Sequence, residues 1–255
     1  MKRILIVILA LALTACGNTA QVVSDGVVLD NTTKGWGFRK MQPRPEVTAE
    51  QAAEMEIYRC YYMGDETENC LYLTFDEGYE NGYTGQILDV LKEKQVPAAF
   101  FVTGPYLRTE TELVKRMVDE GHIVGNHSVN HPSLPDLSVS EIENELYDLD
   151  MMFYELCGSH MKYLRPPRGE YSTAVLDITS KMGYTNVFWS VAYVDWQTDK
   201  QQGKNHALES VLPQLHSGAV ILLHAVSSDN AAAMGELIDS ARAAGYTFKS
   251  LDEYK

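Results

Sequence analysis

Two adjacent carboxylates, Asp76 and Glu77, follow an alternating apolar stretch at 71–75 and precede Gly78. The alternation is typical of a buried strand. Neighbouring side chains of a strand point to opposite sides, but a bend at the glycine could turn both carboxylates to the same side at the strand end. Two carboxylates at a strand end suggest a site that holds a metal ion and moves a proton. A charged turn after an edge strand is the alternative.

His127 and His131 stand four residues apart, directly after a predicted strand at 122–126. Side chains at this spacing meet on one face of a helical turn, where two imidazoles can bind one metal ion. Pro132 limits the predicted helix to a single turn within a loop. The alternative is two surface histidines that lie near each other by chance.

Other polar side chains also follow predicted strands. Arg165 and Arg168 lie in a loop stiffened by two prolines, and an arginine held in this way can bind a carboxylate through two hydrogen bonds. A surface ion pair is the alternative for this loop. Asp195 is followed by Trp196, which could stack on a sugar ring or belong to the core. His224 ends an apolar strand, and taken alone it is better explained as a core histidine.

The elements that must position these residues alternate along the chain. The apolar pattern predicts strands at 71–76, 98–103, 122–126, 162–165, 185–190, 219–224 and 246–250, and helices at 81–94, 110–120, 138–157, 172–182, 205–216 and 229–244. Ser138 and Glu141 form a capping box at the start of one helix. Alternating elements of this kind predict βαβ units and a parallel sheet. About seven such units favour a barrel, whose strand ends would share one face.

The first 15 residues have the pattern of an export signal, with a basic start and an apolar run too short to cross a bilayer. The run ends in Leu-Thr-Ala-Cys, which resembles the lipobox of bacterial lipoproteins and implies cleavage before Cys16 and lipidation of its thiol. Simple secretion and an uncleaved short anchor are the alternatives. Residues 16–34 are expected to form a tether, and 35–70 an N-terminal wrap packed on the main domain at 71–255.

Composition narrows the possible partners. The formal net charge of −14 over 255 residues disfavours nucleic acid and anionic lipid, which attract Lys and Arg. The four cysteines contain no CxxC pair, so a thiolate metal site is not expected. Cys60 and Cys70 could form a small-loop disulfide in an exported chain, whereas Cys157 is expected to be a free thiol. We expect a monomer.

Together, the polar segments occur in the order of the five motifs of polysaccharide deacetylases, the NodB-like enzymes of carbohydrate esterase family 4. The segments are Thr74-Phe75-Asp76-Glu77-Gly78, His127 with His131, Arg165-Pro166-Pro167, Asp195-Trp196 and Leu222-Leu223-His224. The sequence is similar to that of the sporulation de-N-acetylases, which make muramic δ-lactam in spore cortex peptidoglycan. The similar segments are residues 36–38, 74–83, 165–169 and 188–196. The resemblance implies an α/β fold, a distorted (β/α)7 barrel with a short N-terminal wrap.

The resemblance also implies a metal site and a base. A divalent metal, with zinc as the favoured identity, would bind Glu77, His127 and His131. Asp76 would take the proton from the attacking water, and Arg165 would orient Asp76. The common family motif has Asp at the position of Glu77, and the longer side chain moves the carboxylate by about one carbon–carbon bond, which matters in a tight metal site.

An acid and a substrate site follow from the same resemblance. His224 would give a proton to the departing amine, and Asp195 would orient it. Trp196 and Tyr79 would bind the sugar. Arg168 could bind the lactyl carboxylate of muramic acid once the stem peptide has been removed, and the freed amine could then close on that carboxyl as a δ-lactam.

The expected function is therefore hydrolytic de-N-acetylation of peptidoglycan glycan strands by a membrane-anchored envelope lipoprotein, with N-acetylmuramic acid as the favoured sugar. De-N-acetylation of N-acetylglucosamine and O-deacetylation of another glycan are alternatives within enzymes. The chain departs from the family pattern at Glu77, and it has Ala192 where many members carry an acid. A non-catalytic lipoprotein that binds the cell wall is therefore a further alternative.

Overall fold

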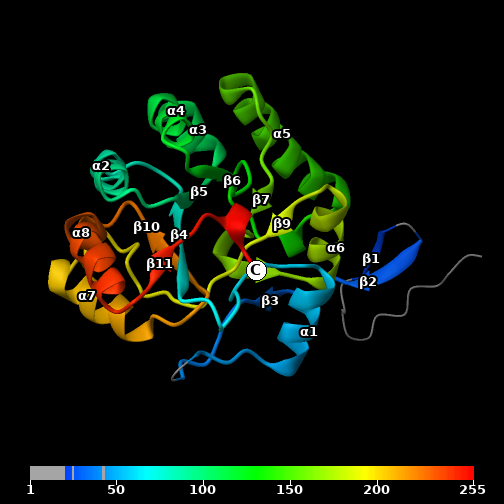
Figure 1. The fold of residues 1–255 in the computed structure, drawn as a ribbon. Coiled ribbons are helices and arrows are strands. Elements are labelled where there is room, and N and C mark those ends of the chain that lie inside the picture. Colours follow the sequence, from blue (N-terminus) through cyan, green and yellow to red (C-terminus); the bar gives the residue numbers. More distant parts are fainter. Residues whose placement is uncertain (1–20, 25, 42–43) are drawn as a thin grey trace, which may run out of the picture.

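A curled parallel sheet forms the centre of the structure (Figure 1). The computed structural model describes residues 21–24, 26–41 and 44–255, so the expected signal at 1–15 and Cys16 lie outside the described residues. The strands of this sheet are β4 (Cys70–Glu77), β5 (Ala98–Val102), β6 (Ile123–Asn126), β7 (Tyr163–Leu164), β9 (Thr185–Asn186), β10 (Ala219–His224) and β11 (Thr247–Phe248). Their order is β10-β4-β5-β6-β7-β9, and β11 pairs with the start of β4.

Helices follow the strands and surround the sheet (Figure 1). They are α2 (Thr84–Lys94), α3 (Gly104–Thr109), α4 (Thr111–Asp119), α5 (Val139–Cys157), α6 (Thr173–Lys181), α7 (Lys204–Val211) and α8 (Ser228–Ala243). The predicted capping box is present, since the Ser138 hydroxyl accepts from the Glu141 backbone and the Glu141 side chain accepts in return. The six-residue α3 was not predicted, because it is too short to show a helical apolar period. Within the described ranges, no helix is long and apolar enough to span a membrane.

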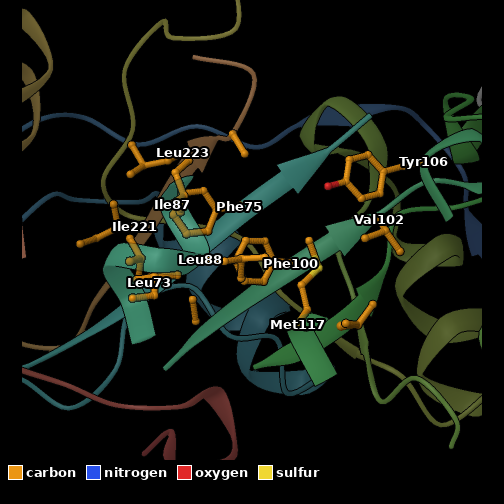
Figure 2. Close-up of a cluster of buried hydrophobic side chains, with 14 of the residues drawn as sticks. Leu73, Phe75, Ile87, Leu88, Phe100, Val102, Tyr106, Met117, Ile221 and Leu223 are labelled. Carbon is orange, nitrogen blue, oxygen red and sulfur yellow. The ribbon is translucent and has the colours of Figure 1, made fainter. Parts of the chain in front are cut away.

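The two faces of β4 bury different neighbours. Leu73 and Phe75 pack in a large cluster with the surrounding helices (Figure 2), and Leu71 belongs to the same cluster. Tyr72 packs in a smaller inner cluster with Phe101 of β5. Because side chains alternate along a strand, the odd-numbered positions of β4 face the helices. The even-numbered positions face the interior of the curled sheet.

The chain after β9 returns toward β10 and joins the two edges of the sheet along a seam. Val191 forms a parallel bridge with Ile221 of β10. At the other end of the seam, Tyr61 forms a parallel bridge with Val187, directly after β9. Met63 forms an antiparallel bridge with Ala219, the first residue of β10. The distorted barrel predicted from the sequence is therefore confirmed. The predicted strand at 185–190 is shorter than expected because its second half bonds across this seam.

Residues before β4 line the outside of the barrel. The strands β1 (Gln21–Ser24) and β2 (Val27–Asp30) pair antiparallel, so this part of the expected tether is a hairpin, and it contacts α6. A further short strand, β3 (Lys34–Gly35), pairs antiparallel with β8 (Glu170–Tyr171). The helix α1 (Ala49–Ile57) buries Met55 against Trp36 and Phe188. This N-terminal part shares a hydrophobic cluster with the barrel.

The cysteines that the structure describes are free thiols. Cys60 and Cys70 are both buried, and the disulfide that their spacing allowed is not formed. The Cys70 thiol contacts the Tyr72 hydroxyl at 3.5 Å. Burial raises the pKa of the Cys60 thiol, so this thiol stays protonated and unreactive at neutral pH.

The C-terminal Tyr254 holds the seam segment in place, and its removal should destabilise the barrel. Its hydroxyl accepts the backbone N–H groups of Tyr62 and Met63 at 3.2 and 3.1 Å, and its ring stacks on Tyr61 at 3.8 Å. Tyr254→Phe leaves both N–H groups unpaired, so we expect a loss of about 1–3 kcal/mol in the free energy of unfolding. Tyr254→Ala should lose more, because the stacking is lost too. Urea unfolding measures both, and a Phe variant as stable as the wild type would contradict the role.

Candidate active site

One cavity of about 470 Å³ lies where the ends of β4 and β10 meet the loops after β6, β7 and β9. The predicted site residues that line it are Asp76, Tyr79, His127, His131, Arg168, Trp196 and His224. Arg165 and Asp195 are buried behind this lining, where they bond to Asp76 and His224. Glu77 is not among the lining residues. The structure therefore brings together all the predicted catalytic and binding residues of the barrel except Glu77.

Asp76 is held by a fully buried arginine. The guanidinium of Arg165 donates to Asp76 Oδ1 at 2.7 Å, to Thr74 Oγ1 at 2.8 Å and to the Val187 carbonyl at 3.0 Å. Burial alone would raise the pKa of Asp76, but the positive charge of Arg165 outweighs it and holds the pKa below its ordinary value. Asp76 is therefore an ionised carboxylate at neutral pH, with Oδ2 free of the guanidinium.

The two histidines after β6 meet at the cavity wall, with ring centroids 4.7 Å apart. They do not lie on a helical turn as predicted, because Ser128 and His131 have left-handed backbones with φ of 61° and 56°. His127 Nδ1 lies 2.7 Å from the Arg165 carbonyl, which can only accept, so the proton is on Nδ1. The unprotonated Nε2 then lies 3.6 Å from Asp76 Oδ2. Burial lowers the pKa of both imidazoles, that of His131 to about 4, so both are neutral at neutral pH.

A second polar pair stands at the end of β10. Asp195 Oδ1 lies 2.7 Å from His224 Nδ1, and Oδ2 accepts the His224 backbone N–H at 2.8 Å. A carboxylate can only accept, so Nδ1 carries a proton and Nε2 is left for the cavity. Burial alone would lower the pKa of His224, but the hydrogen bond and charge of Asp195 outweigh it and raise the pKa above its ordinary value. This arrangement suits a group that donates a proton.

Glu77 lies on the other face of β4 from Asp76. The strand runs through Glu77 before the chain bends, so the side chain alternates to the face that carries the helices. It is completely buried, and neither carboxylate oxygen has a hydrogen-bond partner among the described residues. Burial, with the charges of Glu80 and Asp76, raises the pKa of Glu77 well above its ordinary value. A neutral carboxyl in this position is a poor metal ligand.

The predicted metal ligands are therefore not brought together. In the part of the chain that the structure describes, no group of three or more His, Cys, Asp or Glu side chains is arranged to hold a metal ion. His127 and His131 supply two nitrogen donors, but the orphaned oxygens of Glu77 lie behind the strand. The residues as placed do not fit a site built from Glu77, His127 and His131.

The loop after β7 forms another wall of the cavity. Arg168 has a left-handed backbone with φ of 59°, and its Nη1 lies 3.9 Å from Glu170 Oε2. Gly169 has φ of 67°, and a Cβ there would lie 2.8 Å from the ring of Trp189, so only glycine fits. The Trp36 backbone N–H donates to the Gly169 carbonyl at 2.7 Å, and its indole N–H donates to the Trp189 carbonyl at 2.8 Å. The N-terminal wrap thus fixes this wall.

Exposed aromatic rings stand at the mouth of the cavity. Trp196 is 49% exposed and Tyr79 is 53% exposed, which is high for such large side chains. The Trp196 ring centroid lies 5.5 Å from that of His224. Aromatic rings beside a polar site are suited to stacking on the apolar faces of sugars.

Two further residues of the site, Thr74 and Trp189, could not be assigned a definite role from the sequence. Thr74 connects Arg165 to β10, because its hydroxyl accepts from the guanidinium and donates to the Ile221 carbonyl at 2.6 Å. Its place two residues before Asp76, on the same face of the strand, is the signal that could have identified it. Trp189 lines the cavity, but no spacing in the sequence separates it from a core tryptophan.

Comparison with known proteins places the chain among deacetylases. The polysaccharide deacetylase family model matches residues 63–187. The peptidoglycan-N-acetylmuramic acid deacetylase PdaA of Bacillus subtilis is 44% identical over 246 residues, covering 95% of this chain and 92% of that protein. The solved structure of PdaA aligns with a TM-score of 0.87 at 44% identity, over 89% of this chain and 98% of that chain.

Two further relatives have the same fold or a similar sequence. A family 4 carbohydrate esterase from Bacillus anthracis aligns with a TM-score of 0.77 at 42% identity, over 89% of this chain and 98% of that chain. The peptidoglycan-N-acetylglucosamine deacetylase of Bacillus cereus is 31% identical over 193 residues, covering 73% of this chain and 88% of that protein.

The position of Glu77 predicts that its charge is not needed to bind a metal. Glu77→Gln has nearly the same shape as the neutral acid and faces the helices, so we expect unchanged zinc binding in equilibrium dialysis and an unchanged melting temperature. His131→Ala is the matched control, because its ring does face the cavity. Loss of zinc from the Gln variant while the fold is kept would show that Glu77 turns inward and is a ligand.

Proposed function

This chain belongs to the polysaccharide deacetylase family, and we propose that it hydrolyses the N-acetyl groups of peptidoglycan, with N-acetylmuramic acid as the sugar it acts on. The observation that carries the proposal is that two cavity residues are each held by a buried partner of opposite charge. Asp76 is paired with Arg165, and His224 is paired with Asp195. The identity of 44% to a peptidoglycan-N-acetylmuramic acid deacetylase over nearly the whole chain supports it.

Acetamide hydrolysis needs a base for water and an acid for the leaving nitrogen. In the proposed mechanism, Asp76 takes a proton from water whose oxygen bonds to the acetyl carbon. As the carbon–nitrogen bond breaks, protonated His224 gives its Nε2 proton to the nitrogen. The products are acetate and a free amine. Asp195 keeps the Nδ1 proton in place and stabilises the charged imidazole before the transfer.

Arg165 positions the base and does not move a proton. Its guanidinium is fully buried and stacks 4.3 Å from the centre of the Phe101 ring, so it stays charged and fixed beside Asp76. The base therefore keeps one orientation, with a single oxygen directed to the cavity. Fixing a reacting group in this way removes part of the entropic barrier of the reaction.

Deacetylases of this family are generally metal-dependent, and a divalent metal, with zinc favoured, is part of the expectation from sequence. Two neutral imidazoles, His127 and His131, are available in the cavity as donors. Glu77 does not lie beside them among the described residues, and the proposed proton transfers use only the side chains of Asp76 and His224.

Arg168 is the proposed determinant for muramic acid. Muramic acid differs from glucosamine by a lactyl ether, which is a free carboxylate once the stem peptide is gone. The Arg168 side chain is half-exposed at the cavity, and its contact with Glu170 is long. It is therefore available to bind that carboxylate through two hydrogen bonds. Closure of the freed amine on the same carboxyl would give the muramic δ-lactam of spore cortex.

We also propose that the protein acts at the cell envelope during sporulation. The pattern of residues 1–15 supports export, and Cys16 supports lipidation and membrane anchoring. Both lie outside the residues that the structure describes. A monomer is proposed, with its cavity open to a glycan strand.

Substrate choice tests the proposal and the role of Arg168 together. We expect the wild type to release acetate from glycan strands that an amidase has stripped of stem peptides, and to release little from intact strands. Arg168→Gln should lower kcat/KM on stripped strands by about 10–100-fold, because a bidentate charged contact is lost. It should spare N-acetylglucosamine oligomers. Arg168→Lys is the matched control and should recover part of the loss.

Equal loss on both substrates would contradict the lactyl contact. Release of acetate from N-acetylglucosamine oligomers alone would favour the glucosamine alternative instead. Tight binding to glycan with no acetate release from any substrate would favour a non-catalytic wall-binding protein.

A further inference from the structure

The carboxylate that supports His224 is itself held by a residue from another element. Oδ1 of Asp195 contacts the His224 ring, while Oδ2 accepts the Nδ2 hydrogen of Asn230 at 2.6 Å as well as the His224 backbone N–H. Asp195 is 1% exposed and Asn230 is 2% exposed, so solvent does not compete for these bonds. Rotation of Asp195 away from the His224 ring would break the bond to Asn230.

Tyr193 holds the oxygen end of the Asn230 amide. The Tyr193 hydroxyl lies 2.5 Å from Asn230 Oδ1. The other end of the amide, Nδ2, faces two atoms that can only accept, Asp195 Oδ2 and the His224 carbonyl, the latter at 3.1 Å. A flipped amide would set its oxygen against both acceptors. Burial, with the charge of Asp195, raises the pKa of Tyr193, so the phenol keeps the proton that it donates.

Both residues have fixed backbones. Asn230 lies in the first turn of α8, where its backbone N–H donates to the capping hydroxyl of Ser227 at 3.1 Å. Tyr193 lies just beyond Val191, which bridges to β10 across the seam. The start of α8 and the seam segment therefore converge on the end of β10, where His224 lies.

We propose that Asn230 and Tyr193 are positioning residues for the proton donor His224. Asn230 holds the Asp195 carboxylate against His224 Nδ1, and Tyr193 holds Asn230 in the orientation that does so. The inference rests on the proposed function, in which His224 protonates the leaving amine.

The electrostatic surroundings of His224 predict what happens when this support is lost. The charged groups that act on the imidazole are Asp195, Asp76 of β4 and Arg165 of the β7 loop, and the Trp196 ring covers one side. Among the described residues, Asp195 alone is hydrogen-bonded to the ring. If Asp195 loses its alignment, it raises the pKa of His224 less, while burial still lowers that pKa. The imidazole then gives up its proton at lower pH.

The experiment compares Asn230→Ala and Tyr193→Phe with the wild type. It measures kcat/KM for acetate release against pH on stripped glycan strands, and the titration of the His224 ring by NMR. For Asn230→Ala we expect kcat/KM to fall by about 10–100-fold, since a bond to a buried charge is lost, and the basic limb to move to lower pH. The His224 titration should move in the same direction. Tyr193→Phe should show the same shifts at smaller size.

A double variant and a matched control make the test specific. Tyr193→Phe should have no further effect in the Asn230→Ala background, because Tyr193 acts only through Asn230. Asn186→Ala removes an equally buried amide that bonds Thr179, and it should lower the melting temperature without moving the pH profile.

Several results would overturn the inference. A lower kcat/KM with an unmoved basic limb and an unmoved His224 titration would mean that Asn230 is only structural. A further loss from Tyr193→Phe in the Asn230→Ala background would mean that Tyr193 acts by another route. If the wild type releases no acetate from any glycan, the proposed function fails, and the His224 titration still decides whether Asn230 and Tyr193 position the imidazole.

Discussion

The buried guanidinium of Arg165 is the constraint on which the rest of the site depends. A charge removed from water is tolerated only if its hydrogen-bonding groups and its charge are matched. Val187, Thr74 and Asp76 accept its N–H groups, and the Phe101 ring covers its face. Thr74 and Asp76 lie two apart on the inward face of β4, so a single strand provides both the neutral and the charged partner. Satisfying the arginine therefore fixes the base in one orientation.

The second half of the site depends on how the sheet closes. His224 ends β10, and Asp195 follows the segment that crosses the seam to reach β10. The two therefore meet only if the edges of the sheet are joined. Segment 61–63, which precedes all the family motifs, fills part of this seam and is held by Tyr254 at the other end of the chain. Residues outside the motifs thus determine where the proton donor lies relative to the base.

Much of this arrangement could be predicted from the sequence, for identifiable reasons. Alternation at 71–76 and the capping box at Ser138 are local signals, and both elements formed as expected. The grouping of Asp76 with the polar residues of other strands followed from the rule that parallel strands end on one face. The side of the strand on which Glu77 lies was not predictable, because it depends on whether the chain bends before or after that residue.

Other features depend on contacts between distant parts of the chain. The spacing of His127 and His131 suggested a helical turn, but the Asn126 side chain accepts the Ser128 N–H at 2.8 Å, and the loop adopts left-handed conformations instead. Asn230 lies 35 residues from Asp195 in sequence, and no local pattern connects them. Such contacts are set by tertiary packing, which a single sequence does not display.

In the proposed mechanism, one carboxylate and one imidazole, each held by a buried partner, move the two protons of amide hydrolysis. The most direct test is acetate release from amidase-stripped glycan strands by the wild type, Asp76→Asn and His224→Gln at neutral pH. We expect release by the wild type and a loss of about 10²–10⁴-fold in kcat for each variant, with the fold intact. Near wild-type release by either variant would contradict it.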